Sequence, residues 1–187
     1  MAAARKIKPS DVQRFTYQDY CTWDDDERWE LIDGIPYAMA APMRKHQRVS
    51  GKIYLQIANF LRGKACEVYY APFDVRLNAD TLDNTVVQPD IAVFCDESKL
   101  DEKGGIGAPE MVVEILSPSS ASHDMIRKYM LYMKVGVREY LIVDPESQTV
   151  VTHILEDGKY NRKDHEKTDV IPVLTLDGCV IDLSEVF

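Results

Sequence analysis

Apolar residues recur along this chain at two spacings, one typical of helices and the other of strands. Residues 46–63 carry Val49, Ile53 and Ile57 four positions apart and end at Gly63. This pattern predicts an amphipathic helix of about four turns, with the apolar residues facing the core and the glycine ending it.

A second amphipathic helix is predicted from about Ala121 to Val135, with Gly136 ending it. Apolar side chains recur along it at helical spacing, at Ile126, Met130 and Met133. We expect these three side chains to form the stripe that packs on the core.

Shorter runs rich in β-branched and aromatic residues predict strands. Asp33-Gly34 separates two such runs in "RWELIDGIPYAMA", a strong hairpin pattern. The run 86–96 is expected to be one strand, with Pro89 near its start or at an edge, and residues 97–109 a loop. Further strands are expected within residues 66–77, 111–116 and 138–161. The order predicts an α+β (α/β-like) fold, in which a central mixed β-sheet is flanked by helices behind an N-terminal hairpin.

The length of 187 residues suits one domain, which we expect over residues 15–187 after a flexible N-terminal arm at 1–14. The net charge of −9 argues against broad affinity for phosphate backbones, although it leaves room for a local basic patch. No apolar run is long enough to span a bilayer, and the first ten residues are too polar for a secretory signal. We therefore expect a cytoplasmic protein without a membrane partner.

The four cysteines, at positions 21, 66, 95 and 179, are widely separated. No CxxC pair or Cys/His cluster is present, which argues against a structural zinc site. We expect all four to be reduced thiols.

Two acidic residues occur in apolar strands of the predicted core. Val112, Glu114 and Leu116 share one face of their strand, because successive side chains alternate. Asp90 leads into another apolar run. Buried carboxylates are costly unless they are paired, and a divalent cation would satisfy both. Lys128 could then place a positive charge near the same point.

Simpler interpretations of these residues remain open. Glu114 could face solvent at a strand end, and Asp90 could belong to a turn after proline. Asp124 and Lys128 lie four residues apart, so they could form an ordinary ion pair on the helix surface. The spacing of the residues alone does not decide between a metal site and these alternatives.

Several segments together resemble the Uma2 family, a group within the restriction-endonuclease-like superfamily. They are "WELIDGIPYAMA", "QPDIAVF", "APEMVVEILSPSS" and "HDMIRKYMLYMKVGVREYLIVDP", and the resemblance extends over residues 15–160. The superfamily motif, PD-(D/E)xK, is similar to Pro89-Asp90 followed by Glu114-Ile115-Leu116. Leu116 stands where the motif has lysine, and the resemblance implies that Lys128 replaces it from the following helix.

The resemblance implies a metal-dependent endonuclease that cleaves phosphodiester bonds with Mg²⁺ or Mn²⁺. Asp90, Glu114 and the backbone carbonyl of Ile115 would hold the metal, with Glu30 as a further candidate ligand. Lys128 would orient or activate the attacking water and stabilise the transition state. Three auxiliary candidates are Gln88, Asp124 and His46. For Glu30 and His46, a surface ion pair and a polar helix start are the alternatives.

The expected partner is nucleic acid, with DNA favoured over RNA, and a homodimer is compatible with the superfamily. The candidate patch for the nucleic-acid backbone is basic: Arg44, Lys45, Arg48 and Lys52. Any amphipathic helix needs a charged face, so that patch has a structural explanation too. The alternative function is a non-catalytic binding module on a nuclease scaffold, since a fold alone does not establish activity.

Overall fold

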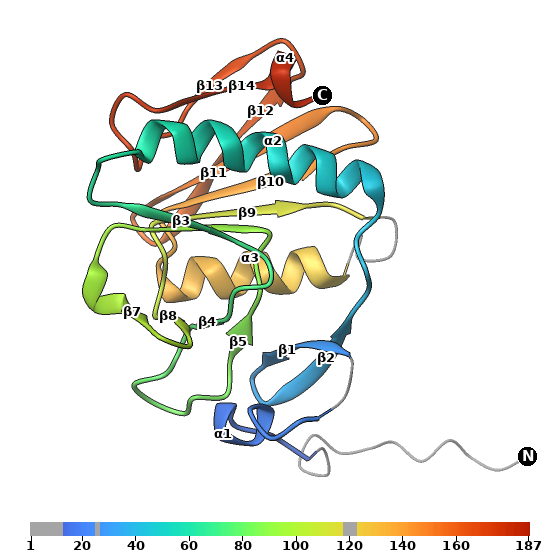
Figure 1. Cartoon of the computed structure of the whole chain (residues 1–187), viewed down its shortest axis with the longest axis vertical. Coiled ribbons are helices and arrows are strands. Elements are labelled where there is room, and N and C mark those ends of the chain that lie inside the picture. Colours follow the sequence, from blue (N-terminus) through green and yellow to red (C-terminus); the bar gives the residue numbers. More distant parts are fainter. Residues whose placement is uncertain (1–12, 25–26, 118–122) are drawn as a thin grey trace, which may run out of the picture.

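A computed structural model describes residues 13–24, 27–117 and 123–187 of the chain (Figure 1). It confirms the predicted mixed α+β architecture, with a central mixed sheet between two long helices. The arm expected over residues 1–14 lies outside the described part, apart from its last two residues.

The central sheet has six strands in the order β12-β11-β10-β9-β6-β3. Its strands are β3 (Glu67–Tyr70), β6 (Ile91–Phe94), β9 (Met111–Ile115), β10 (Glu139–Asp144), β11 (Thr149–Glu156) and β12 (Lys159–Glu166). Strands β9 and β10 are parallel, and every other neighbouring pair is antiparallel. All four residues of β6 are buried, as expected for a strand covered on both faces.

A second sheet of six strands lies beside α3, in the order β2-β1-β5-β4-β8-β7, and four of its strands have only two or three residues (Figure 1). Its strands are β1 (Arg28–Ile32), β2 (Ile35–Met39), β4 (Val75–Arg76), β5 (Val86–Val87), β7 (Leu100–Asp101) and β8 (Gly104–Ile106). The predicted hairpin joins β1 to β2, and Asp33 and Gly34 both take the positive φ that a tight hairpin turn requires.

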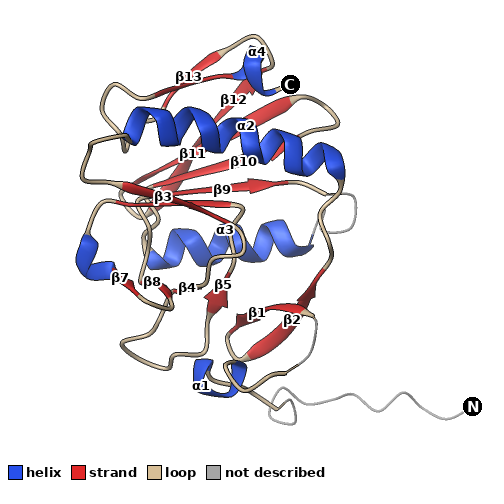
Figure 2. Ribbon diagram, in the orientation of Figure 1, coloured by secondary structure: helices blue, strands red, loops and turns tan. Residues whose placement is uncertain are grey.

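Two long helices cover opposite faces of the central sheet (Figure 2). Helix α2 (Arg44–Leu61) packs through Val49, Ile53 and Ile57, as predicted. Helix α3 (His123–Val135) packs on the other face, where the second sheet also contributes to the core. Val113 of β9 faces α2 and Val112 faces α3.

The remaining elements are short. They are α1 (Tyr17–Tyr20), the 3-10 turn η2 (Glu97–Lys99), β13 (Val170–Pro172), β14 (Val180–Asp182) and α4 (Leu183–Val186). Thr16 and Asp19 form a capping box at the start of α1, as their spacing suggests. No helix within the described ranges is both long and apolar enough to cross a membrane.

The predicted buried stripe of α3 is wrong. Ile126 is 67% exposed and Met130 is 53% exposed. The helix instead buries Lys128 and Tyr132, because acidic groups on the neighbouring strands pair with the ammonium and accept from the phenol. Met133 is partly buried against the core.

The expected single strand over residues 86–96 is also wrong. Val86–Val87 belongs to the second sheet and Ile91–Phe94 to the central sheet, so the chain changes sheet at Pro89 and Asp90. Proline has no backbone N–H to donate to a neighbouring strand, so Pro89 suits the point where the chain leaves one sheet and enters the other. The expected loop at 97–109 contains η2, β7 and β8.

The expectation of four reduced cysteines is wrong for one pair. Cys66 and Cys95 form a disulfide, and their Cα atoms lie 3.9 Å apart. Cys66 directly precedes β3 and Cys95 directly follows β6, and antiparallel pairing of these strands brings them together. Cys21 and Cys179 are free thiols.

Candidate active site

Glu114 projects from β9 towards α3, on the face that strand alternation predicted. Its Oε1 accepts hydrogen bonds from Lys128 Nζ at 3.0 Å and from the Tyr132 hydroxyl at 2.8 Å. Lys128 and Tyr132 are four residues apart, so both lie on the same face of α3. The charge within the apolar strand is therefore paired with a cation and a hydroxyl from one helix.

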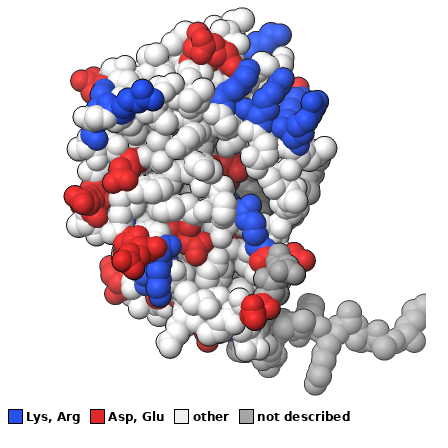
Figure 3. All heavy atoms as spheres, viewed as in Figure 1, with Lys and Arg blue, Asp and Glu red and all other residues white. Residues whose placement is uncertain are grey.

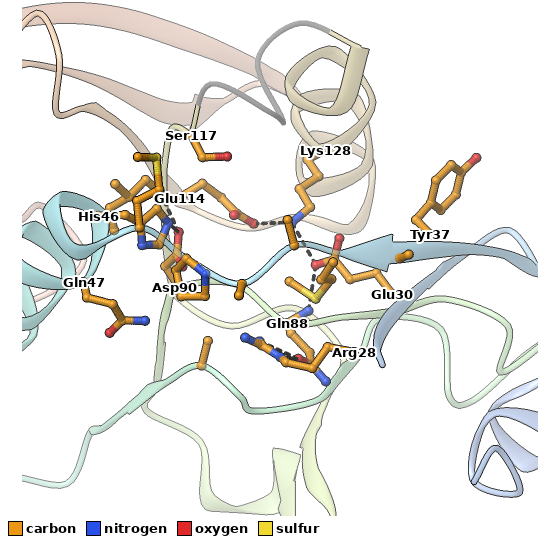
Figure 4. Close-up of a pocket in the computed structure, with 18 residues that line it drawn as sticks. Arg28, Glu30, Tyr37, His46, Gln47, Gln88, Asp90, Glu114, Ser117 and Lys128 are labelled. Atoms are coloured by element: carbon orange, nitrogen blue, oxygen red, sulfur yellow. Dashed lines mark hydrogen bonds and ion pairs between the residues drawn. The ribbon is translucent and has the colours of Figure 1, made fainter. Parts of the chain in front are cut away.

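Lys128 joins the two sheets through its ammonium group. Its Nζ lies 2.8 Å from Glu30 Oε1 as well as 3.0 Å from Glu114 Oε1. Glu30 comes from β1, is 2% exposed, and also accepts the backbone N–H of Gln88 at 2.9 Å. Figure 4 shows the ammonium between the two carboxylates. Lys128 is thus a buried bridge and not a surface partner.

Asp90 lies between β5 and β6, next to the end of β9. Its Oδ2 accepts the backbone N–H of Ile115 at 2.7 Å and lies 3.2 Å from His46 Nε2. The N–H and C=O of one strand residue point to the same edge. The Ile115 carbonyl therefore faces the side of β9 on which Asp90 lies. The carbonyl and the Asp90 carboxylate could thus bind the same metal ion.

These groups line one pocket of about 330 Å³ (Figure 4). Of the residues predicted for the site, it contains Glu30, His46, Gln88, Asp90, Glu114, Ile115 and Lys128. The side chain of Asp124 lies outside the described part of the chain. The structure thus brings together every predicted site residue whose side chain it describes, apart from the basic patch.

The basic patch does not line this pocket. Figure 3 shows Lys and Arg side chains gathered over the N-terminal half of α2. Lys45 Nζ lies 3.1 Å from a carboxylate oxygen of Glu146, and Arg48 Nη2 donates to the Phe187 carbonyl at 3.3 Å. The basic patch therefore lies outside the pocket, and two of its four side chains already interact with other residues of the protein.

Sequence reasoning missed Arg28 and the role of Gln88 in holding it. The Gln88 Oε1 accepts from Arg28 Nε at 3.1 Å and from Nη2 at 2.7 Å. The Gln88 amide nitrogen donates to Asp74 at 2.8 Å. Gln88 thus fixes the Arg28 guanidinium in the wall of the pocket. Arg28 could have been predicted from its position two residues before Glu30 on the same hairpin strand. That spacing places both side chains on one face of the strand.

The charges in the pocket shift the pKa values of its groups. Burial raises the pKa of Glu114 to about 7; Lys128 opposes this shift, whereas Asp90 and Glu30 reinforce it. Burial alone would lower the pKa of Lys128, but Glu114 and Glu30 raise it well above its usual value. Lys128 therefore stays a cation at neutral pH, while Glu114 titrates there.

The pKa of His46 also shifts upward, although burial alone would lower it. The hydrogen bond and negative charge of Asp90 outweigh that effect. His46 Nδ1 is buried and has no hydrogen-bond partner among the residues described. Within the described ranges, His46 therefore contacts Asp90 through Nε2 and keeps Nδ1 without a hydrogen-bond partner.

The donor set suits a hard cation in its chemistry. Among the described residues, the contacts of Asp90 fall on Oδ2 and those of Glu114 on Oε1, so these residues leave each carboxylate a second oxygen for a ligand. Mg²⁺ typically uses one or two protein carboxylates together with water and substrate oxygens. Within the described ranges, no three His, Cys, Asp or Glu residues are grouped closely enough to form a metal cage. The residues thus fit a cation held by two carboxylates and a carbonyl, and not an all-protein cage.

The fold has a close counterpart among solved structures. The structure is similar to the crystal structure of a "putative nuclease belonging to DUF820" from Anabaena variabilis. The TM-score is 0.75 over 92% of this chain and 97% of that chain, at 18% identity, so the likeness concerns the fold.

Sequence comparison gives the family. Residues 16–184 match the Uma2 model, which is described as "Putative restriction endonuclease", and the chain belongs to this family. It is also 28% identical to the uncharacterized protein slr1290 of Synechocystis sp. over 156 residues, covering 81% of this chain and 80% of that protein.

Proposed function

We propose that this protein is a metal-dependent endonuclease that hydrolyses phosphodiester bonds, with DNA as its substrate. The observation that carries the proposal is the buried Lys128 ammonium, held by Glu114 and Glu30 in the same pocket as Asp90. Family membership and the nuclease-like fold support it.

Asp90, Glu114 and the Ile115 carbonyl would hold Mg²⁺ or Mn²⁺. Such an ion, when bound, polarises a phosphoryl oxygen and lowers the pKa of a coordinated water. Three carboxylates, of Glu30, Asp90 and Glu114, line the pocket with two permanent cations, Arg28 and Lys128. When Glu114 is ionised and His46 is neutral, the carboxylates exceed these two cations by one charge, which favours a further cation at this point.

The protein's own groups orient the substrate. Lys128 cannot serve as a general base, because its raised pKa keeps it protonated. Its ammonium stabilises negative charge that develops on the phosphoryl group. Arg28 has five N–H donors, and Gln88 engages only Nε and Nη2, so the guanidinium can also bind a phosphate oxygen.

A cleavage assay tests the proposal. The wild type is incubated with single-stranded DNA, duplex DNA and RNA, each with Mg²⁺, Mn²⁺ or EDTA. We expect cleavage of DNA that requires the metal and is lost in Glu114→Gln, with circular dichroism showing that the variant is folded. Equal cleavage by the folded variant would overturn the site assignment. Retention of nucleic acid without cleavage under every metal would instead support a binding module.

A further inference from the structure

A second pocket, of about 280 Å³, opens next to the candidate active site. The two pockets share Gln47, Ala71 and Asp90. The remaining lining residues of the second pocket are Ser50, Gly51, Tyr54 and Tyr70. A group bound there would be adjacent to whatever Asp90 contacts in the first pocket.

The walls of this pocket are aromatic and carry little charge. Tyr54 of α2 and Tyr70 of β3 meet edge to face, with ring centroids 4.8 Å apart and an interplanar angle of 71°. Tyr70 is 60% exposed, so much of its ring is open to another group. Asp90 is the one charged residue in the lining, and no Lys or Arg is among these residues. These walls suit a flat, uncharged group better than a phosphate.

Strand pairing fixes the position of Tyr70. It pairs with Ile91 across β3 and β6, and the next residue, Ala71, donates its N–H to the Asp90 carbonyl at 3.2 Å. Alternation turns Val68 and Tyr70 towards α2, whereas Tyr69 packs on the opposite face. Tyr70 therefore directly precedes a residue whose backbone is hydrogen-bonded to Asp90, a proposed metal ligand. This contact holds the exposed Tyr70 ring near the candidate active site.

Gly51 leaves space in the pocket. It lies within α2, and a Cβ added there would meet no atom within 4 Å. Glycine inside a helix is less favourable than most other residues, so helix stability does not explain why Gly51 stands at this position. Gln47, one turn earlier on the same face, is exposed and offers both a donor and an acceptor.

We propose that the Tyr54–Tyr70 pocket binds one unpaired base of the nucleic-acid substrate, next to the phosphate that is cleaved. The inference rests on the proposed function and extends it to the substrate class. Bases stack on aromatic side chains regardless of their identity, and an amide such as Gln47 can bond the base edge. A base inside a duplex is already stacked, so the site selects single strands or extruded nucleotides.

Binding measurements in EDTA separate this subsite from catalysis. Fluorescence anisotropy compares a short single strand with the matching duplex for the wild type, Tyr70→Leu and Leu55→Ala. Leu55 is an exposed residue of α2 outside both pockets and serves as the control. We expect Tyr70→Leu to weaken single-strand binding roughly five-fold or more, with little change for the duplex or for the control.

The substrate and Gly51 provide independent checks. A scan of abasic positions through the single strand should find one whose loss weakens wild-type binding but not Tyr70→Leu binding. Gly51→Leu should raise the melting temperature through better helix propensity and still weaken single-strand binding. Unchanged binding by Tyr70→Leu or Gly51→Leu, or a flat abasic scan, would overturn the subsite. Tyr70-dependent binding in a protein that never cleaves would instead refute the nuclease proposal and leave the subsite standing.

Discussion

Replacing Lys128 by methionine is expected to destabilise the protein strongly. The side chains of Lys128, Glu30 and Glu114 are 9%, 3% and 13% exposed, and the ammonium is within 3.0 Å of both carboxylates. Methionine preserves most of the apolar stem but leaves the carboxylates without their shared cation. Removing one partner of a buried ion pair costs about 3–5 kcal/mol in the free energy of unfolding. For a chain of this size, that lowers the melting temperature by about 6–20 °C.

The loss should depend on pH in a defined direction. The Glu114 pKa is about 7 in the folded protein against an ordinary value of 4.5, so folding takes up a proton in this interval and this group's contribution to stability falls as pH rises. Without the Lys128 cation, this pKa rises further. The pH range over which Glu114 lowers stability then extends to higher pH. The difference in unfolding free energy between variant and wild type therefore widens as pH increases.

Urea unfolding followed by circular dichroism at about pH 5 and about pH 8 measures both effects. Lys134→Met is the matched control, because Lys134 is exposed in the last turn of the same helix. It should change stability by only a few tenths of a kcal/mol. A loss below about 1 kcal/mol for Lys128→Met at the higher pH, typical of surface pairs, would refute the buried bridge. So would a loss that is equal at both pH values.

Three further predictions concern the metal and Glu114. Asp90→Asn should weaken Mn²⁺ binding about 100-fold or more in calorimetric titration, since even groups that only support metal ligands contribute roughly 10–100-fold; unchanged affinity would exclude Asp90 as a ligand. At subsaturating metal, cleavage should increase with pH through about 7, because Glu114 of the metal-free protein must ionise before it binds the cation, and a pH–rate profile that falls over this range would contradict that role. Tyr132→Phe removes the 2.8 Å hydrogen bond to Glu114, so it should move that midpoint to higher pH and cost about 1–2 kcal/mol of stability in urea unfolding; an unmoved midpoint would show that the phenol does not tune the carboxylate.

The sequence predicted the parts of the site that depend on local geometry. Alternation along β9 placed Glu114 on the correct face, and the following helix supplied Lys128. The partners of Lys128 were harder to predict, because Glu30 lies 98 residues away in the chain. Because that partner could not be seen in the sequence, the apolar residues Ile126 and Met130 were predicted to form the buried face of α3. The paired Lys128 occupies that face instead.

Glu139 shows why a buried acidic residue alone does not identify a site. It lies on β10 and is fully buried, as the apolar run around it suggests. Its carboxylate accepts backbone N–H groups from Leu174 and Thr175 at 3.2 and 2.8 Å. These N–H groups and the Thr175 hydroxyl, at 2.9 Å, satisfy the Glu139 carboxylate. Glu114 instead accepts from the Tyr132 hydroxyl and from Lys128, and it lines a pocket together with Lys128. Only tertiary contacts distinguish the two acids.

Diffraction from Mn²⁺-soaked crystals, recorded at the manganese absorption edge, tests the central proposal most directly. We predict an anomalous peak coordinated by Asp90, Glu114 and the Ile115 carbonyl, with Lys128 Nζ still within hydrogen-bond distance of Glu30. The peak should be missing in Asp90→Asn crystals prepared in the same way. A pocket that stays without a peak at saturating Mn²⁺ would contradict the proposed metal site, as would a peak bound only by residues outside it.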